Sequence, residues 1–306
     1  MDGTAAITTR FPDRVTVALE QTTLGEAIHV IGLKSGGRFV VMNGLESVPL
    51  SALRFKNAKF SDVAEKLSKQ AGCALQSTPY YYFFYPAGYE KLTELSLVDV
   101  TSLPLQQNVE LVQFGYGIPL YAVFSWIGQS LGTTIVADNA IAEARCGEVS
   151  LRDIRLIDAV EAILKSARVA EFRSETTQDY LFLFAPGNPN PSNCLLNEDS
   201  LDLRQKEYLD KRVTVVLPAP PKSPGTIRID SQALPLQTVL PEFSRQLGVK
   251  VVAEESIRAF PVNPVTFYDV SVRVAMDLLI RQWLGGNCGY QFLSDRIVIR
   301  HREITK

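Results

Sequence analysis

Residues 235–254 read PLQTVLPEFSRQLGVKVVAE, and this stretch decides the fold. Apolar residues recur at helical spacing from Leu236 to Leu247, and Gly248 then supplies the residue type that most readily ends a helix. The apolar residues after the glycine alternate at the spacing of a strand. A second strand, a second helix and a closing strand follow, up to Ile299.

The same pattern occurs three times along the chain, at offsets of 116 and then 96 residues. Most of each copy can be laid over the other two without a gap. The leucine that opens the helix, the glycine that ends it and the apolar residue of the second strand recur as Leu24, Gly36 and Phe55; Leu120, Gly132 and Leu151; and Leu236, Gly248 and Phe267. Internal repetition decides the architecture before any single motif does.

Each copy has the order βαββαβ, so we expect an α+β fold made of three small tandem units. The simplest arrangement of one unit is a sheet with two helices on one face. The expected boundaries are copy one at 11–87, a linker at 88–108, copy two at 109–187, a Pro-rich linker with room for a short helix at 188–224, and copy three at 225–306.

Composition bounds the function without identifying it. A formal net charge of -2 over 306 residues argues against a nucleic-acid surface, which needs a basic patch. No apolar run approaches the roughly 20 residues of a membrane helix, so we expect no membrane span in this chain. The first ten residues are polar and lack the apolar segment of a signal peptide.

The residues that usually carry chemistry are scarce. The chain has two histidines: His29, expected on the solvated side of a helix, and His301, which has no acidic or cysteine residue arranged around it. No nucleophile elbow, phosphate loop, dinucleotide fingerprint or metalloprotease motif is present. We therefore expect no enzyme, no cofactor and no metal. The cysteines show no C-x-x-C spacing, which argues against zinc and leaves disulfide pairing open: Cys73, Cys146, Cys194 and Cys288.

Copies one and two both close on an aromatic strand, at 80–85 and 180–184. One face of such a strand packs on the helices of its own unit, and the other face needs a second cover. The favoured interpretation is a contact between units of this chain, since large aromatic residues mostly serve packing. The alternative is a partner-binding face or edge. The candidate interface residues are Tyr81, Phe83, Tyr85, Tyr180 and Phe182.

Each copy resembles the short N-terminal domain shared by secretins and TonB-dependent signal-transducing receptors. The family pattern is a strand, an L-x-x-[VAL]-[LIF]-x-x-[ILF] helix, a glycine, an apolar strand with an acidic residue after it, a V-x-L strand and a D-A-[LV]-x-x-[IL]-L helix. Copy two matches it best, through Leu120 to Ile127, Gly132, Ile135 to Asp138, Val149 to Leu151, and Asp158 to Leu164.

The resemblance implies a protein–protein interaction scaffold in the periplasm, with no catalytic residues. Three copies in series are similar to the periplasmic region of an outer-membrane secretin of a type II secretion or type IV pilus system. Its partners would be further subunits of a ring, or inner-membrane secretion or pilus components. The membrane association would come from a region that this chain does not contain.

Two other interpretations remain open. The first is a stand-alone periplasmic accessory or TonB-type signalling protein built from the same domain. The second, less favoured, is a nucleic-acid-binding protein with KH-like units, which would need a G-x-x-G loop and a basic face.

Overall fold

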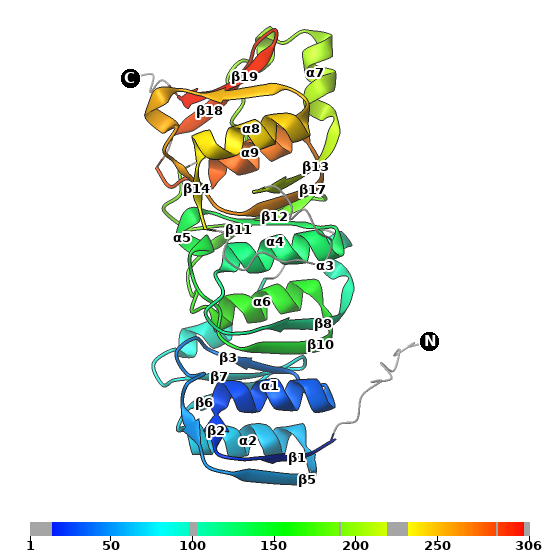
Figure 1. Cartoon of the computed structure of the whole chain (residues 1–306), viewed down its shortest axis with the longest axis vertical. Helices are drawn as coiled ribbons and strands as arrows, with labels where there is room; N and C mark the ends of the chain where they lie inside the picture. Colours follow the sequence, from blue (N-terminus) through cyan, green and yellow to red (C-terminus); the bar gives the residue numbers. More distant parts are fainter. Residues whose placement is uncertain (1–13, 98–102, 190, 219–231, 286, 303–306) are drawn as a thin grey trace. The chain divides into compact units, whose positions relative to one another are not determined.

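The computed structural model describes residues 14–97, 103–189, 191–218, 232–285 and 287–302. Helices and strands alternate throughout these ranges, which confirms the predicted α+β class (Figure 1). By their contacts the described residues form two compact units. The first holds 14–97, 107–117 and 145–170, and the second holds 103–106, 118–144 and the residues from 171 onward.

Copy one lies wholly in the first unit. Its elements are β1 (Arg14–Leu19), β2 (Thr22–Thr23), α1 (Leu24–Ser35), β3 (Phe39–Val41), β4 (Pro49–Leu50), β5 (Leu53–Lys59), α2 (Phe60–Ala71), β6 (Ala74–Ser77) and β7 (Tyr82–Tyr85), followed by η1 (Glu90–Glu94). β1 pairs antiparallel with β5, and the short β2 pairs with β4. β7 pairs parallel with β3 and antiparallel with β6.

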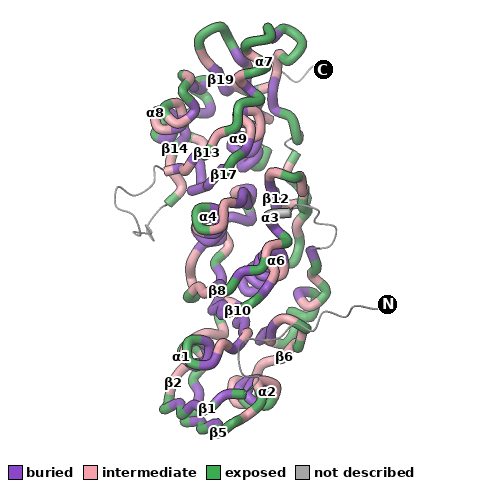
Figure 2. Tube along the Cα trace, turned by 90° about the vertical axis from the view of Figure 1, so that its right-hand side faces the viewer, coloured by how far each residue is buried: buried purple, intermediate pink, exposed green. Residues whose placement is uncertain are grey.

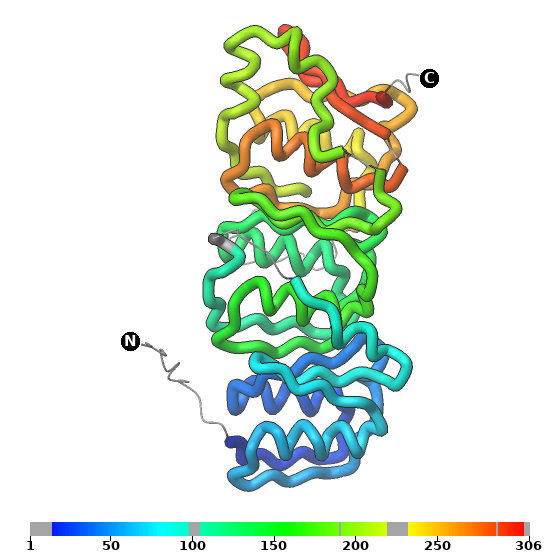
Figure 3. The backbone as a smooth tube through the Cα atoms, turned by 180° about the vertical axis from the view of Figure 1, so that it is seen from behind, coloured from blue at the N-terminus to red at the C-terminus, as the bar shows by residue number. Residues whose placement is uncertain are grey.

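The strands of copy one therefore do not form the single sheet expected from the sequence. α1 contacts β1, β2 and β3, and α2 contacts β4, β5 and β6, so both helices lie between two separate sheets (Figures 1 and 3). The physical reason is that alternation shows which face of a strand is buried, but not which strand is its neighbour. The fold class stands, whereas the arrangement with helices on one face is corrected.

Three further elements complete the first unit: β8 (Asn108–Phe114), β10 (Val149–Arg155) and α6 (Leu156–Ser166). β10 pairs antiparallel with β8 on one side and with β3 on the other. The result is a five-stranded sheet in the order β6-β7-β3-β10-β8. Strands from two different copies thus share one sheet, and α6 contacts β3, β8 and β10.

The second unit begins with elements around copy two. They are α3 (Leu103–Gln106), α4 (Leu120–Leu131), β9 (Thr134–Ala137), α5 (Asn139–Ala142), β11 (Arg173–Thr176) and β12 (Tyr180–Phe184). β12 pairs parallel with β9 and antiparallel with β11. This three-stranded sheet has the same pairing as β6-β7-β3, with the aromatic closing strand in the middle.

Copy three has the same two-sheet arrangement as copy one. Its elements are β13 (Arg212–Leu217), β14 (Leu234–Pro235), α8 (Leu236–Leu247), β15 (Lys250–Ala253), η3 (Glu255–Ile257), β16 (Pro261–Val262), β17 (Val265–Ser271), α9 (Val272–Arg281), β18 (Cys288–Phe292) and β19 (Arg296–His301). β13 pairs with β17 and β14 with β16, while the other sheet has the order β15-β19-β18. α8 contacts β13 and β15, and α9 contacts β17 and β18.

The predicted linker 188–224 is more structured than expected. It contains η2 (Glu198–Ser200) and α7 (Leu203–Asp210), whose N-terminus is held by a capping box between Asp202 and Gln205. It also contains β13, the first strand of copy three, which begins at Arg212. The boundary of copy three was predicted at residue 225 because several prolines precede that residue. Proline is typical of linkers, but it is also found at strand ends, and here the prolines follow β13.

The helix-ending glycines have the predicted role. Gly36, Gly132 and Gly248 cap α1, α4 and α8 with φ values of 71°, 63° and 77°. These left-handed conformations cost little only for glycine. The local signal for where each first helix ends is therefore contained in the sequence.

A second left-handed position recurs in a strand of each copy. Asn57, Asp153 and Asp269 are the fifth residues of β5, β10 and β17, and their φ values are 50°, 46° and 45°. Asn and Asp tolerate this conformation because their short side chains bond to the nearby backbone. This residue has no opposite residue in the neighbouring strand, and the strand pairing of β5, β10 and β17 continues after it.

We predict that Asp153→Val lowers the free energy of unfolding by about 1–2 kcal/mol, because a β-branched residue is strained at positive φ. Asp153 is exposed, so the substitution removes no core contact. Asp153→Gly is the matched control and should leave stability unchanged or raise it slightly. Chemical denaturation of both variants measures the difference; equal losses in the two would contradict a backbone origin.

Candidate interaction site

The five aromatic residues expected at a partner interface are all buried. Tyr81, Phe83, Tyr85, Tyr180 and Phe182 have exposed fractions between 0 and 9%. Their strands also have no free edge, since β7 and β12 are the middle strands of their sheets. The hypothesis that these side chains offer a partner an exposed face is therefore corrected. The favoured interpretation, a contact between copies, agrees with what covers them.

In the first unit, α6 of copy two covers the closing strand of copy one. The Tyr81 hydroxyl donates to Glu161 Oε1 at 3.1 Å, and Glu161 pairs at 2.9 Å with Lys165, whose side chain is 2% exposed. The ammonium of Lys165 also lies 5.7 Å from the centre of the Tyr81 ring. Burial and the nearby Glu161 carboxylate raise the pKa of Tyr81 well above its usual range, so it stays a neutral donor.

In the second unit, α9 of copy three covers the closing strand of copy two in the same manner. Arg281, at the position that corresponds to Lys165, lies 4.2 Å from the centre of the Phe182 ring. It donates two hydrogen bonds to Glu175, at 2.9 and 2.8 Å. Burial acts to raise the pKa of Glu175, but hydrogen bonds from Arg281 and Tyr180 outweigh it and hold that pKa below its usual value.

A second contact between copies docks a strand into a groove formed by a helix and a strand. In the first unit, β10 enters the groove between α1 and β3, where Val149 pairs with Val40 and Ser150 pairs with Phe39. A Cβ atom on Gly32 of α1 would lie 2.9 Å from the Ser150 Cβ and closer still to its hydroxyl. The absence of a side chain at Gly32 therefore lets the strand approach the helix.

His29 lies at the rim of this groove. Its Nδ1 is 3.1 Å from Glu148 Oε1, and its side chain is 48% exposed. Gln113 of β8 also reaches Nδ1, at 3.1 Å. The histidine expected to be only a solvated surface residue thus takes part in the contact between copies.

In the second unit, β17 lies in the corresponding groove between α4 and β9. The Thr266 hydroxyl is 3.0 Å from the hydroxyl of Ser125 and donates to the Ser125 carbonyl at 3.1 Å. A Cβ atom on Gly128 would lie 3.1 Å from the Thr266 Cβ. Gly128 corresponds to Gly32, and Thr266 corresponds to Ser150. The sequence signal for this close approach is a glycine inside a helical pattern, since such a glycine often has a packing role.

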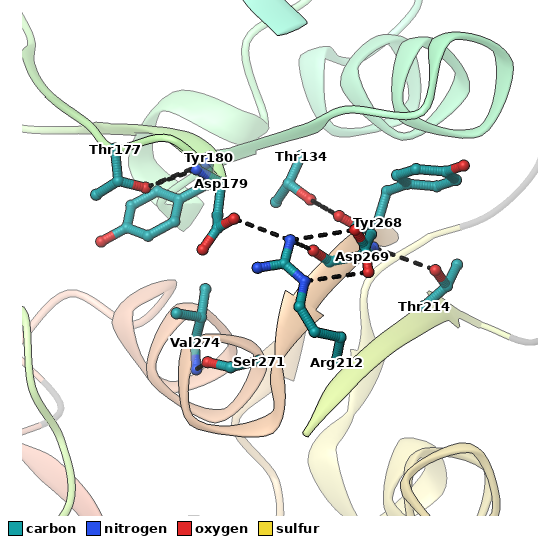
Figure 4. A network of polar contacts seen from close by, with 10 residues as sticks. All are labelled: Thr134, Thr177, Asp179, Tyr180, Arg212, Thr214, Tyr268, Asp269, Ser271 and Val274. Atoms are coloured by element: carbon teal, nitrogen blue, oxygen red, sulfur yellow. Dashed lines mark hydrogen bonds and ion pairs between the residues drawn. The ribbon is translucent and has the colours of Figure 1, made fainter. Parts of the chain in front are cut away.

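Polar contacts fix the far end of β17 (Figure 4). The Thr134 hydroxyl accepts from the Tyr268 amide at 2.8 Å and donates to the Tyr268 carbonyl at 3.3 Å. Arg212 of β13 pairs with Asp179 at 2.9 Å and with Asp269 at 3.1 Å. Because Arg212 is 48% exposed, these ion pairs mainly set the position of the strand rather than adding much stability.

The third groove, between α8 and β15, holds no strand from the described part of the chain. Its volume is about 460 Å³, whereas about 10 Å³ is left beside β17 at the corresponding residues of α4 and β9. One face of α8 is more exposed than the corresponding face of α4 (Figure 2). The α4 residues Tyr121, Ala122, Ser125 and Gly128 are buried, whereas the α8 residues at the same positions are exposed or half-buried: Gln237, Thr238, Pro241 and Ser244. We call this the β15 groove and define it by its lining residues: Gln237, Leu240, Pro241, Ser244, Lys250, Val251, Val252, Ala253 and Arg258.

Pro241 lies inside the first helix of copy three, a position where proline usually kinks or breaks a helix. α8 nevertheless starts at Leu236 and runs through Pro241 to Leu247. A proline at this position removes one N–H, so the carbonyl of Gln237 has no helical donor four residues on. Both Gln237 and Pro241 line the β15 groove.

Within the described ranges, no three His, Cys, Asp or Glu side chains gather in a way that could hold a metal ion. Across the same residues, no helix combines the length and apolar character needed to cross a membrane. Compared with known proteins, the chain matches no family model, no curated protein and no solved structure.

One buried carboxyl has an unusual pKa. Asp277 of α9 is 7% exposed and accepts a hydrogen bond from the Cys194 amide at 3.0 Å. Burial raises the pKa of Asp277 from 3.8 to about 7, although that hydrogen bond and three arginines, Arg281, Arg273 and Arg302, act to lower it. Asp277 lies in the interior of copy three, so its titration bears on stability.

We predict that Gly32→Ala destabilises the protein by about 1–3 kcal/mol, because the added methyl group overpacks the contact with Ser150. The second substitution Ser150→Gly removes the opposing side chain, so the double variant should recover part of the loss. Thermal or chemical denaturation of the four proteins in this double-mutant cycle gives the coupling energy. A coupling energy of zero would mean that the two residues do not meet.

We predict that Asp277→Asn changes how stability depends on pH. Because the folded pKa is about 7 and the usual value is 3.8, the native state binds the extra proton between these pH values. The wild type should therefore lose about 4 kcal/mol, relative to the variant, as the pH rises from 4 to 7. Denaturation curves at each pH test this; parallel pH profiles would contradict the raised pKa.

Proposed function

We propose that this chain is a protein–protein interaction scaffold whose binding site is the β15 groove. The observation that carries the proposal is the contrast between three corresponding grooves. Two of them hold a strand from the next copy, and the third is open in the described structure. The two corresponding grooves each bind a strand of this chain. We therefore expect the third groove to bind a strand as well.

The floor and the edge of the third groove favour this function. Leu240, Val251 and Ala253 form an apolar floor, with exposed fractions of 7, 4 and 6%. β15 pairs with β19 on one side only. On its other edge the Val251 amide donates to the Ser244 hydroxyl at 2.9 Å and the Ala253 carbonyl accepts from Arg258 Nε at 3.2 Å, so a bound strand would replace these side-chain bonds. An exposed strand edge beside an apolar groove is the usual setting for binding by strand addition.

The biological setting that we propose is the periplasm, as the N-domain region of an outer-membrane secretin. Support comes from the resemblance of the three copies to the short secretin and receptor domain, and from the way each copy docks on the next. In this setting the partners are other subunits of a ring, or inner-membrane secretion or pilus components. Function as a stand-alone periplasmic accessory protein is the outcome expected if no ring forms.

A photo-cross-linking amino acid placed at Ser244 in the source cells tests the proposal. We expect a cross-linked species well above 33.9 kDa in the envelope fraction. The control is the same amino acid at Ser51, an exposed residue between β4 and β5. Equal cross-linking at both positions, or an uncross-linked protein in the cytoplasm, would contradict the proposal, whereas a soluble periplasmic adduct would identify an accessory protein.

A further inference from the structure

Resting on the proposed function, we infer that the β15 groove binds an acidic strand of a different polypeptide, and not a second copy of this chain. The strand runs antiparallel to β15 and has a small residue where it crosses α8. The inference follows from the strands in the two occupied grooves and from the charges around the open one.

The occupied grooves set the direction and register of the bound strand. β10 runs antiparallel to β3, with Val149 opposite Val40 and Ser150 opposite Phe39. The residues of β15 that correspond to Val40 and Phe39 are Val252 and Val251. A bound strand in this register should pair with these two valines and lie across α8 at the residue opposite Val251. Its backbone would replace the Ser244 hydroxyl, which now accepts from the Val251 amide at 2.9 Å.

The helix limits which side chain can stand at that crossing. Gly32 and Gly128 face Ser150 and Thr266 in the occupied grooves, and Ser244 has their place in α8. Ser244 thus has a Cβ atom where the two occupied grooves have none. Since a Cβ atom on Gly32 would lie 2.9 Å from the Ser150 Cβ, the residue that crosses Ser244 should be glycine.

The sheet face beside the groove differs in charge from the occupied ones. Phe83 stands opposite Val40 and Phe182 stands opposite Val136, each on a face that the next copy covers. Opposite Val252, β19 has Val298, and the flanking residues on the same face are Arg296 and Arg300. An aromatic face that a neighbour buries is thus replaced by a cationic face that lies half-open to solvent.

One carboxylate, Asp295, serves two of these cations. Arg296 pairs with Asp295 at 2.8 Å, and the charge of Lys250 also acts to lower the pKa of Asp295. The ion pairs of the described residues include none made by Lys250, Arg258 or Arg300. Electrostatic complementarity then favours carboxylates on the partner, which would add to both association rate and specificity. The two docking strands already have an acid at their fifth residue, as V-S-L-R-D and V-T-F-Y-D.

A second copy of this chain fits the groove poorly. The strand of copy one that corresponds to β10 and β17 is β5, which reads LRFKNAK. Arg54 stands where Ser150 and Thr266 cross the helix, so its side chain would meet Ser244. Lys56 stands where Tyr268 meets Thr134, and would therefore face Lys250. Size and like charge both oppose head-to-tail association through this groove.

Fluorescence anisotropy with the purified full chain and labelled peptides tests the inference. The probe copies residues 263–271 with T266G and Y268E, which gives NPVGFEDVS. The control peptide is LRFKNAK from β5. We expect the acidic probe to bind at least about tenfold more tightly than the control, a difference of about 1.4 kcal/mol. Replacing the glycine of the probe by Arg should abolish this preference.

Variants of the protein locate the binding site. Ser244→Trp should fill the groove and weaken binding at least about tenfold, and Arg300→Glu should weaken it several-fold while reducing its salt dependence. Arg204→Glu, on the exposed side of α7, is the charge-matched control and should change nothing. Circular dichroism of each variant separates loss of binding from loss of fold.

Other outcomes would overturn the inference in distinct ways. Binding that Ser244→Trp leaves intact would place the peptide elsewhere. Concentration-dependent dimers that Arg54→Glu strengthens and Ser244→Trp abolishes would make a second copy the occupant. Tight binding of heparin that displaces the probe, with no preference for a small central residue, would indicate a polyanion site. If the probe fails while Ser244 still cross-links in cells, the partner chemistry is wrong and the scaffold function stands.

Discussion

The structure depends on one close approach, that of a strand to a helix at a position without a side chain. At Gly32 and at Gly128, a strand from the following copy passes so near the helix that even a methyl group would crowd it. Glycine costs a helix interior about 1 kcal/mol relative to alanine, so the two glycines are best explained by this packing. The hydroxyl residues that they face, Ser150 and Thr266, complete the contact with a small polar group.

The second contact between copies joins a cation to an aromatic strand. Lys165 and Arg281 occupy corresponding positions on α6 and α9, and each is buried against a closing strand and a carboxylate. A buried charge is costly unless it is paired. These residues therefore determine the position of the helix on the strand more than they add to the free energy of unfolding. Together, the strand contact and the cation contact join each copy to the next.

Copy three departs from this pattern at the positions where a further copy would attach. Ser244 stands in place of the glycine, Lys250 in place of Thr134, and Arg296 and Arg300 flank Val298 where Tyr180 and Phe184 flank Phe182. In repeat proteins, terminal units carry polar outer faces because no neighbour covers them. The β15 groove keeps an apolar floor at Leu240, Val251 and Ala253, while the residues around it have become cationic.

The sequence by itself determined the α+β class, the threefold recurrence of the elements and the ends of the first helices at Gly36, Gly132 and Gly248. Those features depend on local periodicity and on backbone preferences, which neighbouring residues express directly. Only the tertiary structure decided that the strands of a copy divide between two sheets, that β10 joins the sheet of β3, and that Tyr81 and Phe182 are covered by the next copy. These depend on contacts between residues far apart in the chain, and the polar or apolar character of a residue does not reveal which neighbour covers it.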